Sequence, residues 1–339
     1  MDQQQAEALC GMEKSMRRLI ELYCMQRPSE KEIADWFAGI GLDALRPEAS
    51  CMAAAMVAAN DYKGTPSELV PRLRGIIRYV HTLNSGMTSG LCALGKQFHE
   101  AGIPAVLLAR TAVHLGYPKP PCRHIWQMQL SVPKADFPRT VALAGQAGFT
   151  VEQTPYSATA RCGNTQCILI RKGMEYARGA KELTVNGVSF LLPNSGELLV
   201  SLAEAVFQAL SGTGLGTNMI PWIMDLHCVI ASTADWKAAA FAAKERGTAG
   251  QVRLVLELYN SLAPSTLTGE ILDLFGTQDH TARLAQLLLE YRNPKPGSSK
   301  LKQLWFSAQL KRDGAHLATL GLFLTSLLRA VGRKLTLES

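Results

Sequence analysis

Hydrophobic positions recur every three or four residues over the first 95 residues, which is the spacing of amphipathic helices. The first predicted helix shows this spacing at Met16, Leu19, Ile20 and Tyr23. Ser29 followed by Glu32 predicts a capping box that opens a second helix, and Thr65 followed by Glu68 predicts another. A further helix is expected over about 90–101. This part of the chain therefore predicts a helical region.

The pattern then changes to short apolar runs bounded by glycine and proline, which is typical of buried strands. An Asn186-Gly187 pair between two such runs predicts a hairpin turn. Helices are expected over 110–118 and 134–147. Strands are expected at 102–109, 124–132, 149–153 and 167–173, and in the two arms of a hairpin over 183–193. We interpret this part as an α/β unit of about five strands.

From Pro193 the helical spacing returns, and Asn194 with Glu197 predicts the start of the next helix. Further helices are expected through residue 291, followed by an exposed linker over 292–300. The fold class predicted is α+β: a mixed-sheet core between two helical regions. Its predicted domains are 1–95, 96–192 and 193–339.

Composition narrows the class of protein only slightly. The formal net charge is +7, from 35 Lys and Arg against 28 Asp and Glu, and this excess favours anionic partners. For a nucleic-acid interface the net charge is the sole support. The eight cysteines show no zinc-ligand spacing, which fits reduced thiols. The polar N-terminus does not resemble a signal peptide, and the most apolar late segment is too short to span a bilayer. We therefore expect a cytoplasmic protein with no membrane association.

Candidate functional side chains lie on the strand that follows Arg123. Gln127 and Gln129 are two residues apart, so a strand would place both side chains on the same face. Many phosphoryl-transfer enzymes carry two metal-binding aspartates at such a place. Here the two positions hold neutral amides.

Five motifs, in order and at the expected spacing, resemble a bacterial family of uncharacterised nucleotidyltransferase-like proteins in the polymerase-beta-like superfamily. The resemblance covers about residues 65–290, and its motifs are AGIPAVLLARTAVHLGYP, CRHIWQMQLSV, ALAGQAGF, LLPNSGELL and WIMDLHCVIASTADW. The resemblance implies a nucleotidyltransferase-like core. It also implies an active site that uses Mg²⁺ and a nucleoside triphosphate.

The chain departs from the family pattern at the positions that carry its chemistry. By this resemblance, Gln127 and Gln129 stand where the family has its aspartates, and Ala109 and Arg110 stand where it has lysine and glycine. Mg²⁺ in such sites needs carboxylate oxygens. We therefore expect a degenerate site with no catalytic residue, no bound metal and no cofactor. The alternative is Mg²⁺ with a nucleoside triphosphate, held by other carboxylates: Glu152, Glu175 and Asp225.

A binding site without metal is the second expectation for this segment, in which no Asp or Glu occurs between Glu100 and Asp136. Cationic side chains in one cleft bind phosphate, carboxylate or an acidic peptide. The predicted ligand-binding residues are Arg110, His114, Arg123, His124, Gln127 and Gln129, with Lys119 and Lys134 nearby. Three other interpretations stay open. In the first, the charges are solvated and Arg123 bonds loop carbonyls. In the second, the glutamines hold each other, and in the third, Asp225 ties helices together.

The sequence thus favours a nucleotidyltransferase-fold pseudoenzyme that binds or scaffolds. An anionic small molecule is one expected ligand. The resemblance further implies a precursor peptide or a companion enzyme, since relatives accompany peptide-modification genes. An active nucleotidyltransferase is the first alternative, and a basic nucleic-acid-binding module is the second. The ligand and the oligomeric state are not predicted.

Overall fold

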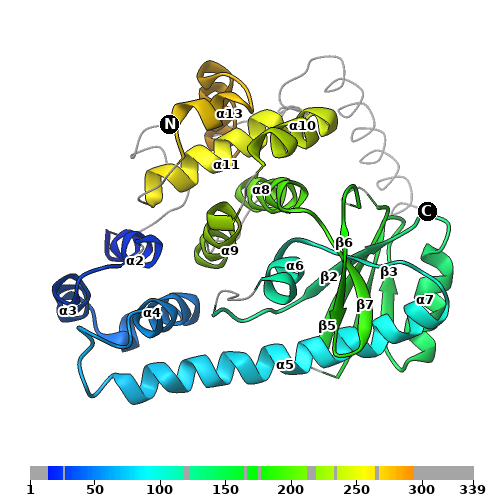
Figure 1. Cartoon of the computed structure of the whole chain (residues 1–339), viewed down its shortest axis with the longest axis horizontal. Helices are drawn as coiled ribbons and strands as arrows, with labels where there is room; N and C mark the ends of the chain where they lie inside the picture. Colours follow the sequence, from blue (N-terminus) through cyan, green and yellow to red (C-terminus); the bar gives the residue numbers. More distant parts are fainter. Residues whose placement is uncertain are drawn as a thin grey trace, which may run out of the picture. The chain divides into compact units, whose positions relative to one another are not determined.

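The computed structural model describes residues 14–292, except 26, 118–121, 164–165, 175–176, 212–218, 233–234 and 264–266. The described chain forms two compact units. The core unit comprises the described residues within Glu13–Leu202 and Ile220–Asp235, and the helical unit those within Ala203–Met219 and Trp236–Ser339. Figure 1 labels the elements of both units. The three predicted domains stay a prediction.

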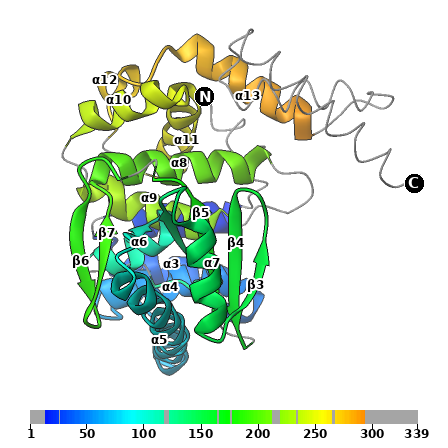
Figure 2. The same cartoon turned by 90° about the vertical axis from the view of Figure 1, so that its right-hand side faces the viewer.

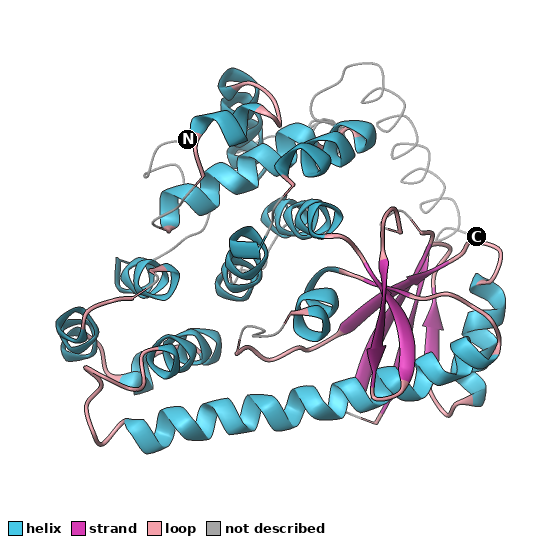
Figure 3. Ribbon diagram, viewed as in Figure 1, coloured by secondary structure: helices cyan, strands magenta, loops and turns pink. Residues whose placement is uncertain are grey.

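A mixed seven-stranded sheet forms the centre of the core unit, in the order β3-β4-β5-β2-β1-β7-β6. Its strands are drawn in magenta in Figure 3. Strands β2 and β5 pair in parallel, as do β1 and β7, and every other neighbouring pair is antiparallel. The strands are β1 (Val106–Leu107), β2 (Met128–Val132), β3 (Thr150–Gln153), β4 (Ser157–Cys162), β5 (Gln166–Lys172), β6 (Lys181–Val185) and β7 (Val188–Leu192). The predicted α+β class with a mixed sheet is confirmed.

One face of this sheet is apolar and is covered by two helices, α5 (Val70–Glu100) and α7 (Phe137–Gln146). Figure 2 shows both helices against the strands. Alternation along β2 explains the arrangement, because Met128, Leu130 and Val132 are fully buried whereas Gln129 between them is partly exposed. The sheet is thus anchored through its apolar face, and the polar positions of β2 are left on the other.

Two of the remaining helices of the core unit begin where local capping predicts. The Ser29–Glu32 capping box is confirmed, since Glu32 N–H donates to Ser29 Oγ at 3.2 Å and Ser29 N–H donates to Glu32 Oε2 at 2.9 Å. Asn194 Oδ1 likewise accepts from Glu197 N–H at 2.9 Å. The remaining helices of the core unit are α2 (Lys14–Cys24), α3 (Glu30–Gly39), η1 (Leu42–Ala44), α4 (Pro47–Ala59), α6 (Ala109–Gly116), the first half of α8 (Ser195–Ser211) and α9 (Ile220–Ser232).

The prediction of two helices between residues 65 and 101 is wrong. No capping box forms at Thr65, and a single 31-residue helix, α5, begins at Val70 with a proline in its first turn. Gly95 lies inside α5 without ending it. Its lack of a side chain lets α5 approach β7 closely. A Cβ at this position would lie 2.4 Å from the Phe190 ring.

Strand boundaries and strand number also differ from the predictions. Strand β2 begins at Met128 rather than at residue 124, because Ile125 N–H bonds to the Asn84 side chain instead of a neighbouring strand. The sheet has seven strands rather than about five. The unpredicted strand β4 alternates Ala158 and Ala160 with polar residues, so it has no apolar run to detect. The predicted hairpin is confirmed, with φ of 49° at Asn186 and 79° at Gly187.

The helical unit holds the second half of α8, then α10 (Trp236–Arg246), α11 (Ala249–Leu262), α12 (Gly269–Asp273) and α13 (Gln278–Arg292). Helix α11 contacts α10, α12 and α13. Its buried Arg253 lies 2.8 Å from Glu257 and donates to Leu272 O. Arg292, the first residue of the predicted linker, ends α13; the rest of the linker and the final segment, 299–339, lie outside the described residues. Among the helices described, none has the length and apolarity that crossing a membrane requires.

Candidate functional site

The two glutamines lie beside each other at the start of β2. Gln129 Nε2 donates to Gln127 Oε1 at 3.5 Å, and Gln127 Nε2 donates to Cys167 Sγ on β5 at 3.4 Å. Both side chains are partly exposed. The open interpretation that these amides hold each other is confirmed. Their long bonds leave oxygens and N–H groups that a ligand can reach.

Polar side chains of β4 and β5 continue this surface, which we name the polar sheet face. Register places Arg161 opposite Cys167, and Arg161 Nη1 lies 3.5 Å from Cys167 Sγ. Arg161 is exposed and Arg171 partly exposed, and neither forms an ion pair with another described residue. The members of the polar sheet face are Gln127, Gln129, Thr159, Arg161, Cys167 and Arg171. Glu152 on β3 is in register with Thr159 and shares this face, so the two arginines stand against one carboxylate and leave one excess positive charge.

A buried cluster of two arginines and one aspartate lies between β2, α6 and α9. Arg123, 2% exposed, donates from Nε to Asp225 Oδ1 at 2.6 Å, and Asp225 is fully buried. Arg110 Nε lies 3.5 Å from Asp225 Oδ2. Arg123 Nη2 also donates to the Arg110 carbonyl at 3.2 Å. Asp225 thus ties α9 to α6 and to the segment before β2, as one interpretation expects. The other interpretation is wrong in two respects: Arg123 bonds a carbonyl of helix α6 rather than of a loop, and Arg110, 19% exposed, is not a solvated surface charge.

The cluster keeps one excess positive charge. The Arg110 guanidinium lies 3.5 Å above the ring of Trp222, a cation–π contact that stabilises a partly desolvated cation. Burial lowers the pKa of Arg110 to about 10, so this side chain stays protonated at neutral pH. Two guanidinium groups therefore share a single carboxylate in a buried setting.

Asn84 on α5 holds the segment that carries Arg123. Its Nδ2 donates to Arg123 O at 2.9 Å and its Oδ1 accepts from Ile125 N–H at 3.0 Å. Replacing Asn84 with alanine would leave both buried backbone groups unpaired, and we expect a loss of about 2–3 kcal/mol in the free energy of unfolding. Urea denaturation measures this loss. The exposed neighbour Ser85→Ala is the control; equal effects of the two changes would contradict the bridging role.

His114 is neutral at physiological pH. Burial, with Arg123 and His81 nearby, lowers the pKa of His114 to about 4, whereas the pKa of an unfolded histidine is about 6.5. The depressed pKa stabilises the fold above pH 6.5, and this contribution is lost as the pH falls towards 4. We expect His114→Gln to reduce the loss of unfolding free energy between pH 7 and pH 4.5 by about 2 kcal/mol. Denaturation curves at both pH values test this; identical losses in the two proteins would refute it.

The other predicted site residues do not join the buried cluster or the polar sheet face. Ala109 begins α6 with a φ of 42°, a conformation that costs a non-glycine residue energy. His124 packs edge-on against Trp126, with ring centroids 3.9 Å apart, and burial lowers the pKa of His124. Lys134 is exposed. Lys119 and Glu175 lie outside the described residues. Ligand binding by the six predicted residues stays a prediction.

Residues 49–264, more than half of the chain, match the family described as "Uncharacterised nucleotidyltransferase". The chain belongs to this family. None of the curated proteins compared with it matches. A solved structure of the antibiotic-resistance factor ANT(2'')-Ia is similar, with 12% identity and a TM-score of 0.33; the match covers 52% of this chain and 92% of that chain.

A nucleotidyltransferase fold implies a magnesium site, and the described side chains do not fit one. Strand register runs from Gln129 through Leu169 and Thr159 to Glu152, so three strand spacings separate Glu152 from Gln129 by about 14 Å. Asp225 already forms ion pairs with Arg110 and Arg123. In the described part of the chain, no three His, Cys, Asp or Glu side chains are grouped to hold a metal ion. Amide oxygens bring no charge to offset Mg²⁺.

Proposed function

We propose that this member of the nucleotidyltransferase family is a binding or scaffolding protein that recognises an anionic group without a divalent metal. One observation carries the proposal: at the start of β2, where the resemblance expects two aspartates, two amides bond to each other on a face with two arginines that form no ion pair with a described residue. An anionic small molecule or an acidic segment of a precursor peptide or companion enzyme has the matching charge.

The chemistry of the polar sheet face supports an anion rather than a cation. Arg161 and Arg171 supply charge-assisted donors, and Gln127, Gln129 and Thr159 supply neutral ones. A phosphate or carboxylate placed here needs no metal to neutralise it. Transfer of a nucleotidyl group, by contrast, relies on a metal ion to hold and neutralise the triphosphate.

Titration calorimetry with inorganic tripolyphosphate in EDTA tests the proposal. We expect binding, and we expect the double change Arg161→Ala with Arg171→Ala to weaken it by about tenfold or more, because each arginine makes charge-assisted bonds. Arg139→Ala, an exposed arginine on α7, is the matched control and should leave the affinity unchanged. No binding, or equal binding by all variants, would refute anion recognition at this face.

A further inference from the structure

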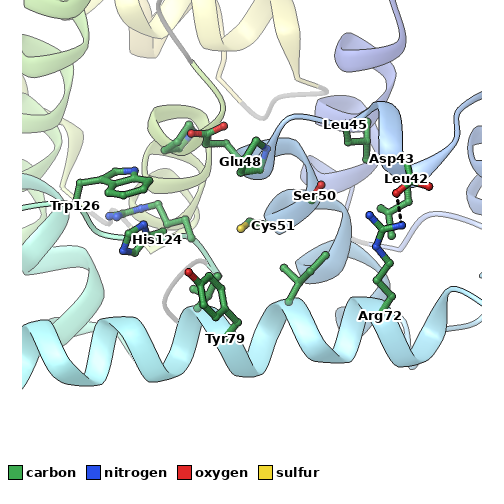
Figure 4. A pocket seen from close by; sticks show the side chains of 15 residues that line it. Leu42, Asp43, Leu45, Glu48, Ser50, Cys51, Arg72, Tyr79, His124 and Trp126 are labelled. Carbon is green, nitrogen blue, oxygen red and sulfur yellow. Dashed lines mark ion pairs between the residues drawn. The ribbon is translucent and has the colours of Figure 1, made fainter. Parts of the chain in front are cut away.

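A pocket of about 470 Å³ lies between η1, α4, α5 and the segment that precedes β2. We name it the aromatic pocket. Its volume suits a small organic ligand. Figure 4 shows Tyr79, His124 and Trp126 at one end and the Asp43–Arg72 ion pair at the other, with Glu48 and Cys51 on the α4 side. Of the predicted ligand-binding residues, Arg123 and His124 line it, and none of the four predicted degenerate positions does.

Two large aromatic side chains of this pocket are exposed to solvent. Tyr79 is 66% exposed and Trp126 is 68% exposed, although most side chains of their size bury the larger part of their surface. Trp126 is held in place by its edge-on contact with His124. An exposed ring beside a pocket gains both apolar burial and ring stacking when a planar group enters. The aromatic end thus favours a ligand with a flat ring.

Arg123 supplies the second observation. This side chain lines the pocket and is 2% exposed, yet its Nη1 finds no hydrogen-bond partner among the described residues. Nε and Nη2 are bonded to Asp225 and to Arg110 O, so Nη1 is the remaining donor group of the guanidinium. A buried donor without an acceptor is costly, and a ligand acceptor would remove that cost.

Charge indicates what kind of acceptor this donor would take. The cluster of Arg110, Arg123 and Asp225 carries one excess positive charge, so it attracts an anion more strongly than a neutral carbonyl. Asp43 and Arg72 neutralise each other at 2.6 Å. Glu48 is the other carboxylate of the pocket, and it opposes an anion placed near it.

We propose that the aromatic pocket binds a small aromatic anion, with its ring against Tyr79 and Trp126 and its carboxylate or similar group accepting from Arg123 Nη1. This site goes beyond the proposed function, because it uses different side chains from the polar sheet face and does not depend on whether nucleotidyl transfer occurs. The ligand would leave the Arg123–Asp225 bond intact.

Titration calorimetry with 2-naphthoate, in EDTA, tests the proposal. We expect saturable binding to one site, and about tenfold weaker binding of the uncharged naphthalene-2-carboxamide. Trp126→Ala should weaken 2-naphthoate binding by about tenfold or more, since it removes the stacking surface. Glu48→Gln should strengthen it by removing a like charge.

The matched control is Tyr156→Ala, because Tyr156 is 65% exposed like Tyr79 but lies on the β3–β4 turn, outside the pocket. Tyr79→Ala repeats the test from α5 in case Trp126→Ala folds poorly. The proposal is overturned by no binding of 2-naphthoate, by equal binding of the carboxamide, or by a loss in Tyr156→Ala as large as in both pocket variants. Each of these results leaves the tripolyphosphate test of the polar sheet face unaffected.

Discussion

Replacing Asp225 with alanine is expected to lower the free energy of unfolding by about 3–5 kcal/mol, which is the range for removing one partner of a buried ion pair. Asp225 is fully buried and bonds Arg123 at 2.6 Å, and it also faces Arg110. Without its carboxylate, two buried guanidinium groups would repel each other with no anion between them. The effect should be large because neither arginine can turn into solvent without breaking other contacts: Arg123 also bonds Arg110 O, and Arg110 packs on Trp222.

Urea denaturation followed by circular dichroism measures this loss. Asp43→Ala is the matched control, since Asp43 is 87% exposed in its ion pair with Arg72 and such pairs contribute about 0–1 kcal/mol. A double variant, Asp225→Ala with Arg110→Met, should recover part of the stability by removing one uncompensated charge. If Asp225→Ala costs no more than Asp43→Ala, the cluster does not tie the core unit together.

Restoring acids at the start of β2 is the second change with a large expected effect. The double change Gln127→Asp with Gln129→Asp should create a divalent-cation site, because both side chains lie on one partly exposed surface and contact each other. Carboxylates are the ligands that Mg²⁺ prefers, and two of them supply the charge that the amides lack. We expect nucleoside triphosphates to bind the double variant at least about tenfold more tightly with Mg²⁺ than in EDTA.

Gln153→Asp is the matched control for this change. Gln153 is an exposed glutamine on β3, at the edge of the sheet, so an aspartate there adds charge without completing a site. The two variants should differ clearly in their response to Mg²⁺. If the double variant gains no metal dependence, the two positions lack the geometry of a metal site, and the resemblance at this motif is superficial.

Much of the fold could be predicted because its signals are local. The Ser29–Glu32 box, the Asn186-Gly187 turn and the apolar alternation of β2 each depend on a few neighbouring residues. Strand β4 could not be found, since alanines replace the large apolar residues that mark a strand. The pattern predicts a separate helix at the end of α5, because the reason for a glycine inside this helix is its close approach to Phe190, which is distant in the sequence.

The site is less predictable, because its contacts join residues that are far apart in the sequence. The sequence singled out Gln127, Gln129, Arg123 and Asp225, but it gave no means of pairing Arg123 with a residue 102 positions later. Asn84 gave no signal at all, since a helical asparagine that bonds two backbone groups elsewhere looks like any polar helix position. Arg161 was missed together with its strand.

The affinity of the unmodified chain for each nucleoside triphosphate, measured by calorimetry in Mg²⁺ and again in EDTA, tests the central claim most directly. That claim is that neutral amides at the start of β2 do not hold a divalent cation. We predict that Mg²⁺ leaves the affinity unchanged or lowers it, because the ion screens the phosphate charge from the arginines. An affinity about tenfold or more higher in Mg²⁺ than in EDTA would contradict the claim.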